Sequence, residues 1–328
     1  MSVSDTDPRT TRVVAAPRPG WSVGLDVGGS KVLGVLVGPD GQLVASVRLP
    51  SRHGGDGIAG TAVEATRRLA DEAGMDLASV RGVGIGLPGI VDPARGSVAH
   101  AVNLGIGDGV PLAALVSEGV GELPVHLEND LNCAALGAAH LSGRLDGDLA
   151  FLALGTGLAA GLLLDGTLRR GAHRAAGEIG HLVYIPGGRP CPCGQRGCLE
   201  RYASGSAVAA QWPARGAGPA PLELFDAADA GDAAAVAVRD EFIRAVAAAV
   251  RVLVLTDDVE RVVLGGGVSE LGERLAGRVR AELEREAAHS EFLASMGIAR
   301  RVVLAPAGVP VGAVGAALLG SKESSWRS

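Results

Sequence analysis

Residues 21–37, WSVGLDVGGSKVLGVLV, predict two short strands joined by a turn of small residues. Apolar side chains alternate with small or polar ones up to Val27, the pair Gly28 and Gly29 interrupts them, and a second apolar run begins at Val32. Alternation with a period of two is typical of a half-buried strand, and adjacent glycines favour a tight connection. This stretch therefore predicts that an antiparallel hairpin opens the folded chain.

The segment after the hairpin extends the same sheet. Residues 39–41, PDG, predict a turn, and residues 43–49 predict a third strand antiparallel to the second. A helix is expected at residues 57–73, where apolar side chains recur on one face, and a fourth strand at residues 80–87. Three strands, a helix and a strand do not follow the strict alternation of a Rossmann domain.

The same opening recurs after residue 150. A strand at residues 151–154 leads into the turn GTG, and a second strand follows at residues 161–164. The flanking glycines are six residues apart in both places: Gly28 and Gly34, then Gly155 and Gly161. We interpret this as two related lobes, each presenting a phosphate-facing hairpin to a central cleft. Chance similarity in a chain with 50 glycines is the alternative.

The remaining elements suggest how the lobes divide the chain. Helices are expected at residues 232–255 and 270–288, and strands at residues 259–264 and 301–304. A last helix of small residues, at 312–319, is expected to pack back on the first lobe. We therefore predict a disordered tail at 1–20, a small α/β lobe at 21–128 that is joined by the C-terminal segment 308–320, and a large α/β lobe at 129–307 that carries the zinc loop described below.

The overall composition narrows the classes of function. The formal net charge of -6 argues against a dedicated nucleic-acid binder, which normally has a basic footprint. Residues 1–20 lack the apolar run of a signal peptide, and no apolar run approaches the ~20 residues that cross a bilayer. We expect a cytoplasmic protein whose partners are neither nucleic acid nor membrane.

Three of the four cysteines lie close together in the sequence. Cys191, Cys193 and Cys198 have the spacing C-x-C-x4-C, with glycine and proline between them, and His181 precedes them. Three thiolates and one imidazole form the closed tetrahedral set of a structural zinc site, and a cytosolic setting favours metal over disulfide. Free cysteines in a loop are the alternative. Cys133 stands apart in a helical segment and is expected to be a small core residue.

The turn of the first hairpin contains groups that suit a nucleotide. Glycine lets the backbone approach a phosphate closely, and a strand-end carboxylate such as Asp26 can hold a hydrated magnesium ion. The order is not that of a Walker A loop, so an ordinary tight hairpin is the alternative. The glycines after the strand at 259–264 would let adenosine lie against backbone, although alone they indicate only a strand-to-helix turn. The candidate nucleotide-binding residues are Asp26, Gly28, Gly29, Ser30, Lys31, Gly155, Thr156, Gly157, Gly265, Gly266 and Gly267.

Residues 127–132, LENDLN, open a helix that is predicted to run towards His140. An aspartate in the first turn of a helix commonly serves as its N-cap. Asp130 also suits a general base, because in-line phosphoryl transfer needs an acceptor hydroxyl that is oriented and relieved of its proton. The local sequence leaves both roles open.

Taken together, these motifs resemble the ROK family of sugar kinases and repressors, most closely its actinobacterial-type glucokinases. The resemblance covers roughly residues 22–319. The matching motifs are D-x-G-G-[TS]-K at 26–31, G-x-P-G-x-[VI]-D at 86–92, L-E-N-D-x-N at 127–132, LGTG at 154–157, AGEIGH at 176–181 and the cysteine segment at 191–200.

The resemblance implies a two-lobed α/β fold of the actin/hexokinase-like ATPase type (ribonuclease H-like) with a central cleft. It implies Asp130 as the catalytic base, Mg2+ bound with ATP, and a homo-oligomer that is a dimer or a tetramer. His181 would bind zinc through one ring nitrogen and offer the other to a sugar hydroxyl. The implied zinc ligands are His181, Cys191, Cys193 and Cys198, and the implied sugar contacts are Asn103, Asn129, Asp130, Glu178, His181 and Glu200.

Five residues depart from the family pattern. Ala159 and Ala160 replace two glycines of G-T-G-x-G-G-G, which places methyl groups where bare backbone usually meets phosphate. Arg174 stands where glycine is usual, Ile106 replaces a common tryptophan, and Ala138 replaces a frequent glutamate. None of these changes removes the expected base, a zinc ligand or a sugar contact, so we expect an active but diverged kinase.

The expected activity is ATP-dependent phosphorylation of a hexose, with glucose as the first candidate and glucose 6-phosphate as its product. An N-acetylhexosamine or fructose is the next candidate substrate. A sugar-sensing regulator is a competing hypothesis, but ROK repressors place a helix–turn–helix module ahead of the sugar lobe, and about twenty residues before the first strand are too few for it. A protein that binds sugar but has lost catalysis through Ala159 and Ala160 is a third hypothesis.

Overall fold

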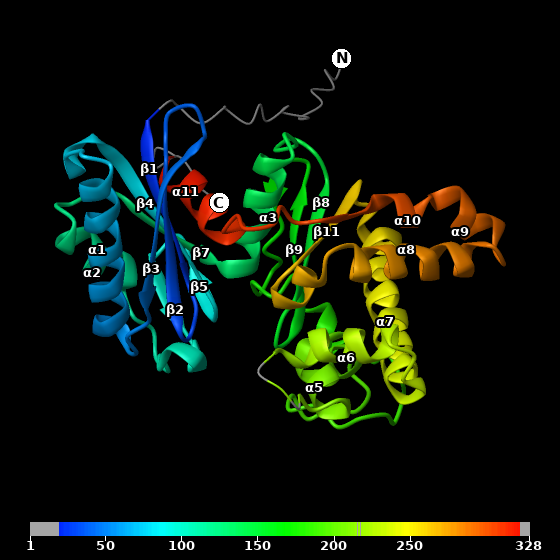
Figure 1. The fold of residues 1–328 in the computed structure, drawn as a ribbon. Coiled ribbons are helices and arrows are strands. Elements are labelled where there is room, and N and C mark those ends of the chain that lie inside the picture. The colour runs from blue at the N-terminus through cyan, green and yellow to red at the C-terminus, as the bar shows by residue number, and fades with distance from the viewer. Residues whose placement is uncertain (1–19, 215, 217, 322–328) are drawn as a thin grey trace, which may run out of the picture.

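Two five-stranded sheets form the framework of the protein (Figure 1). The computed structural model describes residues 20–214, 216 and 218–321, so nearly all of the predicted tail at 1–20 lies outside the described residues. In the first sheet, β1, β2 and β3 are antiparallel neighbours, and β4 and β7 continue from β1 in parallel. Its strands, in spatial order, are β3 (Leu43–Pro50), β2 (Lys31–Val37), β1 (Trp21–Val27), β4 (Val80–Leu87) and β7 (Val125–Asn129).

The second sheet repeats this topology strand for strand. Its first strand in the chain lies in the middle, the next two lie antiparallel on one side, and the last two lie parallel on the other. The spatial order is β10 (Thr167–Leu168), β9 (Leu158–Leu164), β8 (Leu149–Leu154), β11 (Arg261–Gly265) and β12 (Val302–Leu304). The repeat of the hairpin in the sequence therefore reflects a repeat of structure and not chance.

Alternating side chains place each sheet against a hydrophobic core. Val23, Leu25 and Val27 of β1 are fully buried, as the pattern at 21–37 predicts. A separate core lies between the second sheet and its helices, and Phe225 and Phe242 are its largest fully buried side chains. Both aromatic residues come from helices that cover one face of the second sheet, so each sheet has a core of its own.

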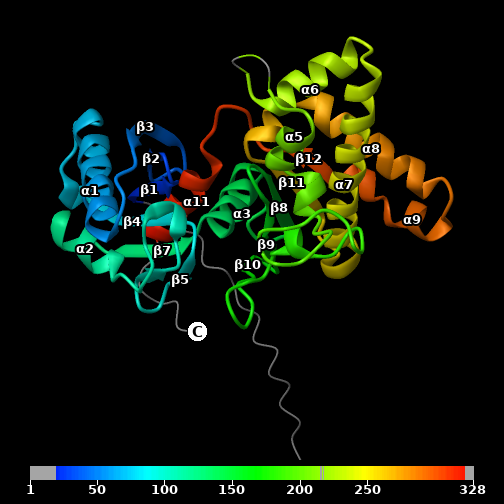
Figure 2. The same ribbon diagram turned by 90° about the horizontal axis from the view of Figure 1, so that it is seen from below.

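Helices cover the outer faces of the two sheets and fill the space between them (Figures 1 and 2). In both views α3 and α11 lie between the sheets, α1 and α2 lie on the far side of the first, and α6, α7 and α8 lie on the far side of the second. The α-helices are α1 (Gly55–Glu72), α2 (Leu112–Gly119), α3 (Asp130–Leu141), α4 (Glu200–Ala203), α5 (Gly205–Gln211), α6 (Ala220–Asp229), α7 (Ala233–Asp257), α8 (Glu273–Ala287), α9 (Glu291–Met296), α10 (Ile298–Arg301) and α11 (Val311–Gly320).

Shorter elements complete the chain. Two short antiparallel strands, β5 (Ile90–Asp92) and β6 (Ser97–Ala99), form a ribbon beside the first sheet. The single-turn 3-10 helices are η1 (Leu77–Ser79), η2 (Val102–Leu104), η3 (Ile179–His181) and η4 (Gly267–Leu271).

The elements predicted from periodicity are present, with two instructive differences. The strand predicted at 161–164 already begins at Leu158, because Leu158 pairs with Leu154 across a turn shorter than expected. The helix predicted at 270–288 is divided into η4 and α8, because Gly272 has a left-handed φ of 60° that interrupts the helix. Cys133 is fully buried in α3, as expected of a small core residue.

The helices α3 and α11 cross with their backbones in close contact. A methyl group added at Gly315 would overlap the carbonyl oxygen of Cys133, and one added at Gly137 would overlap that of Val311. Because α11 also packs on β1 and β4 while α3 packs on β8 and β9, this crossing joins the two sheets. Small residues at the crossing are therefore a requirement of the fold.

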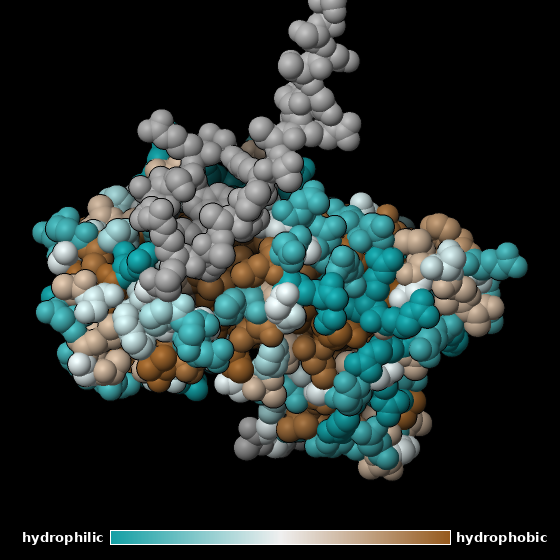
Figure 3. Space-filling model, turned by 90° about the horizontal axis from the view of Figure 1, so that it is seen from above, coloured by the Kyte–Doolittle hydropathy of each residue, from teal (hydrophilic) through white to brown (hydrophobic). Residues whose placement is uncertain are grey.

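The surface of the described residues is mixed in character. Seen from above, hydrophobic side chains appear in the middle of this face and hydrophilic ones lie to either side (Figure 3). Among the described residues, no helix combines the length and the apolar character that crossing a membrane requires.

Gly315→Ala is expected to lower the free energy of unfolding by about 2 kcal/mol or more, because the methyl group has no space between α3 and α11. Gly277→Ala in α8 is the matched control, since its nearest neighbour would be a flexible Glu273 oxygen at 3.7 Å. Replacing glycine by alanine inside α8 should raise the free energy of unfolding by about 0.5–1 kcal/mol. Urea denaturation measures both variants, and equal responses would contradict the crossing as a steric constraint.

Candidate active site

The start of α3 is organised by its first residues and their neighbours. Asn129 is the N-cap: its Oδ1 accepts hydrogen bonds from the backbone N–H groups of Leu131 at 3.0 Å and Asn132 at 3.4 Å. Residues 127–129 end strand β7, so the prediction that the whole segment LENDLN opens the helix is wrong: α3 begins at Asp130. The capping role weighed for Asp130 belongs to Asn129. The Oδ1 atom of Asp130 also accepts a hydrogen bond from the Leu131 N–H, at 3.0 Å. The carboxylate of Asp130 is thereby held at the positive end of a helix.

Asp130 has two acidic neighbours: in addition to burial, Glu178 raises its pKa, and Asp130 in turn raises the pKa of Asp26. Burial raises the pKa of Asp130, and the carboxylate of Glu178 adds to the rise, while the N–H of Leu131 opposes it. Burial also raises the pKa of Asp26 to about 6, with Asp130 adding to the rise and Lys31 opposing it. Glu178 comes from the segment before η3 and Asp26 from the end of β1, so both sheets contribute to one acidic site.

The first hairpin turn lies beside a predicted sugar contact. The Gly28 N–H donates to the Lys31 carbonyl at 3.0 Å, which closes the turn. A methyl group on Gly29 would lie 3.0 Å from the carbonyl oxygen of Asn103, so the turn and the η2 segment are in contact. Asp26 of β1 lies next to the start of α11: a methyl group on Gly312 would be 3.1 Å from Asp26 Oδ2. The side chains of Ser30 and Lys31 are exposed.

The second hairpin turn lies beside the other predicted nucleotide residues. The Gly155 N–H donates to the Gly157 carbonyl at 3.1 Å, and the Ser206 hydroxyl donates to the Thr156 carbonyl at 2.6 Å. Gly266, between Gly265 and Gly267 after β11, has φ 81° and approaches Leu154 so closely that a methyl group would lie 2.7 Å from its carbonyl oxygen. The structure therefore brings the GTG turn and the three-glycine turn together.

Glu200 is anchored to this second hairpin. Its Oε2 accepts a hydrogen bond from the Leu158 N–H at 3.0 Å, and the same oxygen would lie 2.5 Å from a methyl group on Gly157. Glu200 begins α4, two residues after Cys198. One of its two carboxylate oxygens is thus engaged by the hairpin backbone.

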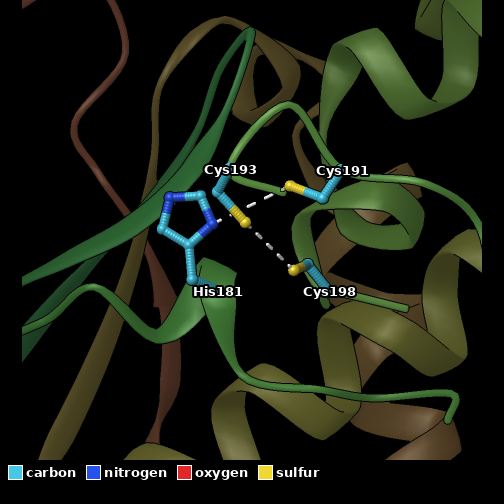
Figure 4. Close-up of side chains that lie close together, drawn as sticks. All are labelled: His181, Cys191, Cys193 and Cys198. Carbon is cyan, nitrogen blue, oxygen red and sulfur yellow. Dashed lines mark hydrogen bonds between the residues drawn. The ribbon is translucent and has the colours of Figure 1, made fainter. Parts of the chain in front are cut away.

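The four predicted metal ligands converge on one point (Figure 4). Their ligand atoms all lie within 4.8 Å of one another, with 3.9 Å between His181 Nδ1 and Cys191 Sγ and 3.7 Å between the Sγ atoms of Cys193 and Cys198. Tetrahedral bonds to zinc place such ligand atoms about 3.6–3.8 Å apart. His181 Nε2 lies on the other side of the ring, 4.0 Å from a carboxylate oxygen of Glu178. This set of four donor atoms fits a closed tetrahedral site for one metal ion.

Ala160, one of the two alanines that replace family glycines, does not place its methyl group where the sequence predicted it. The methyl group of Ala160 is buried in the core on the helix-covered face of the second sheet, so it is not exposed to a ligand. Strand alternation turns Ala159 to the opposite face, where Gly161 packs against the carbonyl oxygen of Leu131. Only one of the two added methyl groups lies on the side of α3.

An ion pair between a buried glutamate and a half-buried arginine, beside this site, was not found from the sequence. Glu128 is 2% exposed, and its Oε2 accepts two hydrogen bonds from the Arg170 guanidinium, at 2.8 and 2.5 Å. Its Oε1 accepts from the Asn129 N–H at 3.0 Å and from Asn132 Nδ2 at 2.9 Å. The pair joins the end of β7 to the segment after β10 and supports the N-cap. A glutamate inside an otherwise buried strand end was the available signal, since a buried charge needs a partner.

The comparisons with known proteins agree with this geometry. A model of the ROK family matches residues 22–323. The chain belongs to the ROK family. This ROK protein is 33% identical over 285 residues to a glucokinase of Halalkalibacterium halodurans, which covers 80% of this chain and 85% of the relative. It is 30% identical over 249 residues to an N-acetylmannosamine kinase of Yersinia pseudotuberculosis, with 76% and 83% covered.

A solved structure extends the comparison to the fold. The crystal structure of a ROK family glucokinase from Streptomyces griseus, in complex with glucose and AMPPNP, is 32% identical and has a TM-score of 0.73. The match covers 92% of this chain and 99% of that one. The ROK protein therefore has the two-lobed actin/hexokinase-like α/β fold that the sequence predicts.

Asp26→Asn is expected to stabilise the sugar-free protein at neutral pH. The pKa of about 6 in the folded chain lies above the ordinary value of 3.8, so the stability that Asp26 contributes is present below pH 4 and is lost as the pH rises to about 6. The variant should therefore gain roughly 1–2 kcal/mol at pH 7.5, discounted for the partial exposure of the side chain, and should lose more than half of this advantage by pH 4.5.

Thermal unfolding of Asp26→Asn and the parent between pH 4.5 and 7.5 measures this difference. Asp40→Asn, in the exposed turn before β3, controls for the removal of one negative charge. A gain that does not change with pH would show that the Asp26 carboxylate is not destabilised by its surroundings.

Proposed function

We propose that this protein transfers the γ-phosphoryl group of ATP to the 6-hydroxyl of glucose, giving glucose 6-phosphate and ADP. The observation that carries the proposal is the position of Asp130, at the N-terminus of α3 beside Asp26 and Glu178. Membership of the ROK family supports it, as do the relatives named as glucokinases.

Asp130 is proposed as the general base. Its carboxylate takes the proton of the sugar hydroxyl while the hydroxyl oxygen bonds to the γ-phosphorus and the bond to the bridging oxygen of ADP breaks. A raised pKa suits this role, because it makes the carboxylate a stronger proton acceptor at neutral pH. The hairpin turns at Gly28 and Gly155 are proposed to receive the phosphates through backbone N–H groups.

Asp26 is proposed to orient the hydrated magnesium ion that accompanies ATP. Magnesium, when bound, supplies positive charge to the phosphate oxygens as negative charge develops on the leaving group. The pKa of about 6 means that Asp26 is mostly ionised at neutral pH and can accept hydrogen bonds from metal-bound water. The remaining proposed nucleotide residues are Gly29, Ser30, Lys31, Thr156, Gly157, Gly265, Gly266 and Gly267.

The proposed sugar contacts keep free groups for hydroxyls. Asn129 uses Oδ1 as the N-cap, which leaves its amide NH2 as a donor. Glu178 and the Nε2 face of His181 lie together, and Glu200 and Asn103 lie beside the two hairpins. Hydroxyl groups both donate and accept, so amides and carboxylates in this arrangement can each bind one or two of them.

We also propose that His181, Cys191, Cys193 and Cys198 hold a structural zinc ion. Four protein ligands leave no open position, so the ion would shape the loop and not take part in phosphoryl transfer. Exposed apolar side chains at Leu182, Val183 and Ile185, next to this loop, are compatible with a homo-oligomer, either dimer or tetramer.

An N-acetylhexosamine kinase is the second candidate, favoured by the match to an N-acetylmannosamine kinase. The two candidates differ at C2 of the sugar, where an acetamido group needs more space than a hydroxyl. Fructose and a catalytically impaired sensor remain as further outcomes of the assay that follows.

Asp130→Asn is expected to lower kcat by about 10²–10⁴-fold while sugar binding persists, because the amide keeps the shape of the side chain but cannot accept the proton. ADP release with Mg-ATP across a panel of hexoses and N-acetylhexosamines measures turnover and names the substrate, and calorimetry measures sugar binding. Asp40→Asn is the control. Substantial activity in Asp130→Asn would remove it from the role of base, and binding without turnover in the parent would favour the sensor.

Cys193→Ser is expected to reduce bound zinc from one equivalent per chain to a small fraction, and to lower the melting temperature, because a hydroxyl is a poor zinc ligand. Elemental analysis of the purified protein measures the metal. Cys133→Ala, in α3, should keep the zinc content of the parent. A parent protein without zinc and with unchanged stability after Cys193→Ser would refute the zinc site.

A further inference from the structure

Arg174 occupies a backbone conformation that glycine adopts more easily. It lies in the loop 171–178, between β10 and η3, and its φ is 59°, in the left-handed region that most residues with a side chain avoid. The N–H of Arg174 donates to the Gly171 carbonyl at 3.4 Å, which fixes the turn. A strained backbone persists where contacts of the side chain hold it in place, so these contacts indicate its function.

The guanidinium of Arg174 reaches the ribbon of the first lobe. Nη1 donates to the carbonyl oxygen of Val91 at 2.6 Å, and Nη2 lies 3.0 Å from Asp92 Oδ1. Both partners belong to β5. Asp92 is itself held in place, because its Oδ1 also accepts from the N–H groups of Ala94 at 3.1 Å and Arg95 at 3.2 Å. One side chain therefore binds two groups of a fixed strand across the two lobes.

The two segments joined by Arg174 both lead to proposed sugar contacts. Glu178 lies four residues after Arg174 in the same loop, and it acts on the pKa of Asp130. On the other side, β5 and β6 form the ribbon that precedes η2, where Asn103 lies. The Glu128–Arg170 pair holds the start of the same loop, and the Ala160 N–H of β9 donates to the Gly177 carbonyl at 2.9 Å near its end, so Arg174 lies between two anchored points of the chain.

We propose that Arg174 is a positioning residue: it ties the loop that carries Glu178 to β5, so that the sugar site is ordered before sugar binds. This inference rests on the proposed function of the same site. Both ends of the contact are groups of this chain, so the contact needs no sugar to form and the ordering of the loop need not oppose sugar binding. Sugar affinity should therefore depend on the contact of Arg174 with β5. The phosphoryl-transfer step depends on Asp130 and should depend much less on the Arg174 contact.

Two substitutions test the tie from its two ends. Arg174→Asn removes the guanidinium but tolerates the left-handed backbone, which separates the loss of contact from a change in backbone freedom. Asp92→Asn removes the charge and keeps an oxygen for the Ala94 and Arg95 N–H groups. Arg169→Asn is the control for charge, since the side chain of Arg169 is exposed and lies in the same connection.

Hydrogen–deuterium exchange without sugar reports the tie itself. Arg174→Asn should speed exchange both at residues 90–92 and in the loop 171–178, and Arg169→Asn should not. Unchanged exchange in Arg174→Asn would mean that the contact does not order the loop, which would overturn the proposal whatever the protein phosphorylates.

Glucose affinity, measured by calorimetry without ATP, reports the consequence. Arg174→Asn and Asp92→Asn should each weaken glucose affinity by about three- to tenfold. Because both remove the same contact, the double variant should bind glucose about as well as the single variant with the lower affinity. In each variant kcat should change less than the affinity does. Faster exchange with unchanged affinity, or additive losses in the double variant, would overturn the positioning role. If the unsubstituted protein binds glucose but does not phosphorylate it, the proposed catalysis is overturned. The effect of Arg174 on glucose affinity can still be measured in that case.

Discussion

The rest of the structure depends on the close approach of α3 and α11. Gly137 and Gly315 let the two backbones meet, and this contact joins a helix packed on the second sheet to a helix packed on the first. Each helix begins beside an acidic side chain of the site: α3 begins at Asp130 itself, and the start of α11 lies next to Asp26 of β1. The crossing therefore sets the separation of two helix N-termini and of the carboxylates that lie at them. Helix N-termini carry partial positive charge, which offsets the repulsion between these acidic groups.

The acidic site also needs an internal cation, and Arg170 supplies it. Glu128, next in the chain to Asn129, would be a buried charge without a counter-charge if the guanidinium were removed, and such a loss is usually costly. Because the pair spans from β7 to the segment after β10, it fixes the N-cap of α3 relative to the second sheet. One motif combines two tasks here: its glutamate supports the framework, and the two residues after it are proposed to contact the sugar.

The sequence was sufficient to predict the fold and the clustering of the four candidate metal ligands, because these depend on local patterns. Alternation at 21–37 and its recurrence near residue 151 predicted both hairpins, and the cysteine spacing predicted the cluster with His181. Contacts between distant segments were not accessible in this way. The partner of Glu128 lies 42 residues away, and the reach of Arg174 to Val91 spans 83. The orientation of Ala160 was predictable in principle, since strand alternation decides it, but it required the strand to begin at Leu158.

The link between Cys198 and Glu200 has a consequence for how such a chain can diverge. A single residue, Leu199, separates a predicted metal ligand from the carboxylate that holds the Leu158 N–H of the second hairpin. An insertion or deletion at this point would move the carboxylate away from the hairpin even if all four metal ligands were kept. Length variation should therefore accumulate elsewhere, for example between α5 and α6, where the connecting segment forms neither a helix nor a strand among the described residues. The segment from Cys198 to Glu200 therefore constrains the lengths of the cysteine loop and of the second hairpin together.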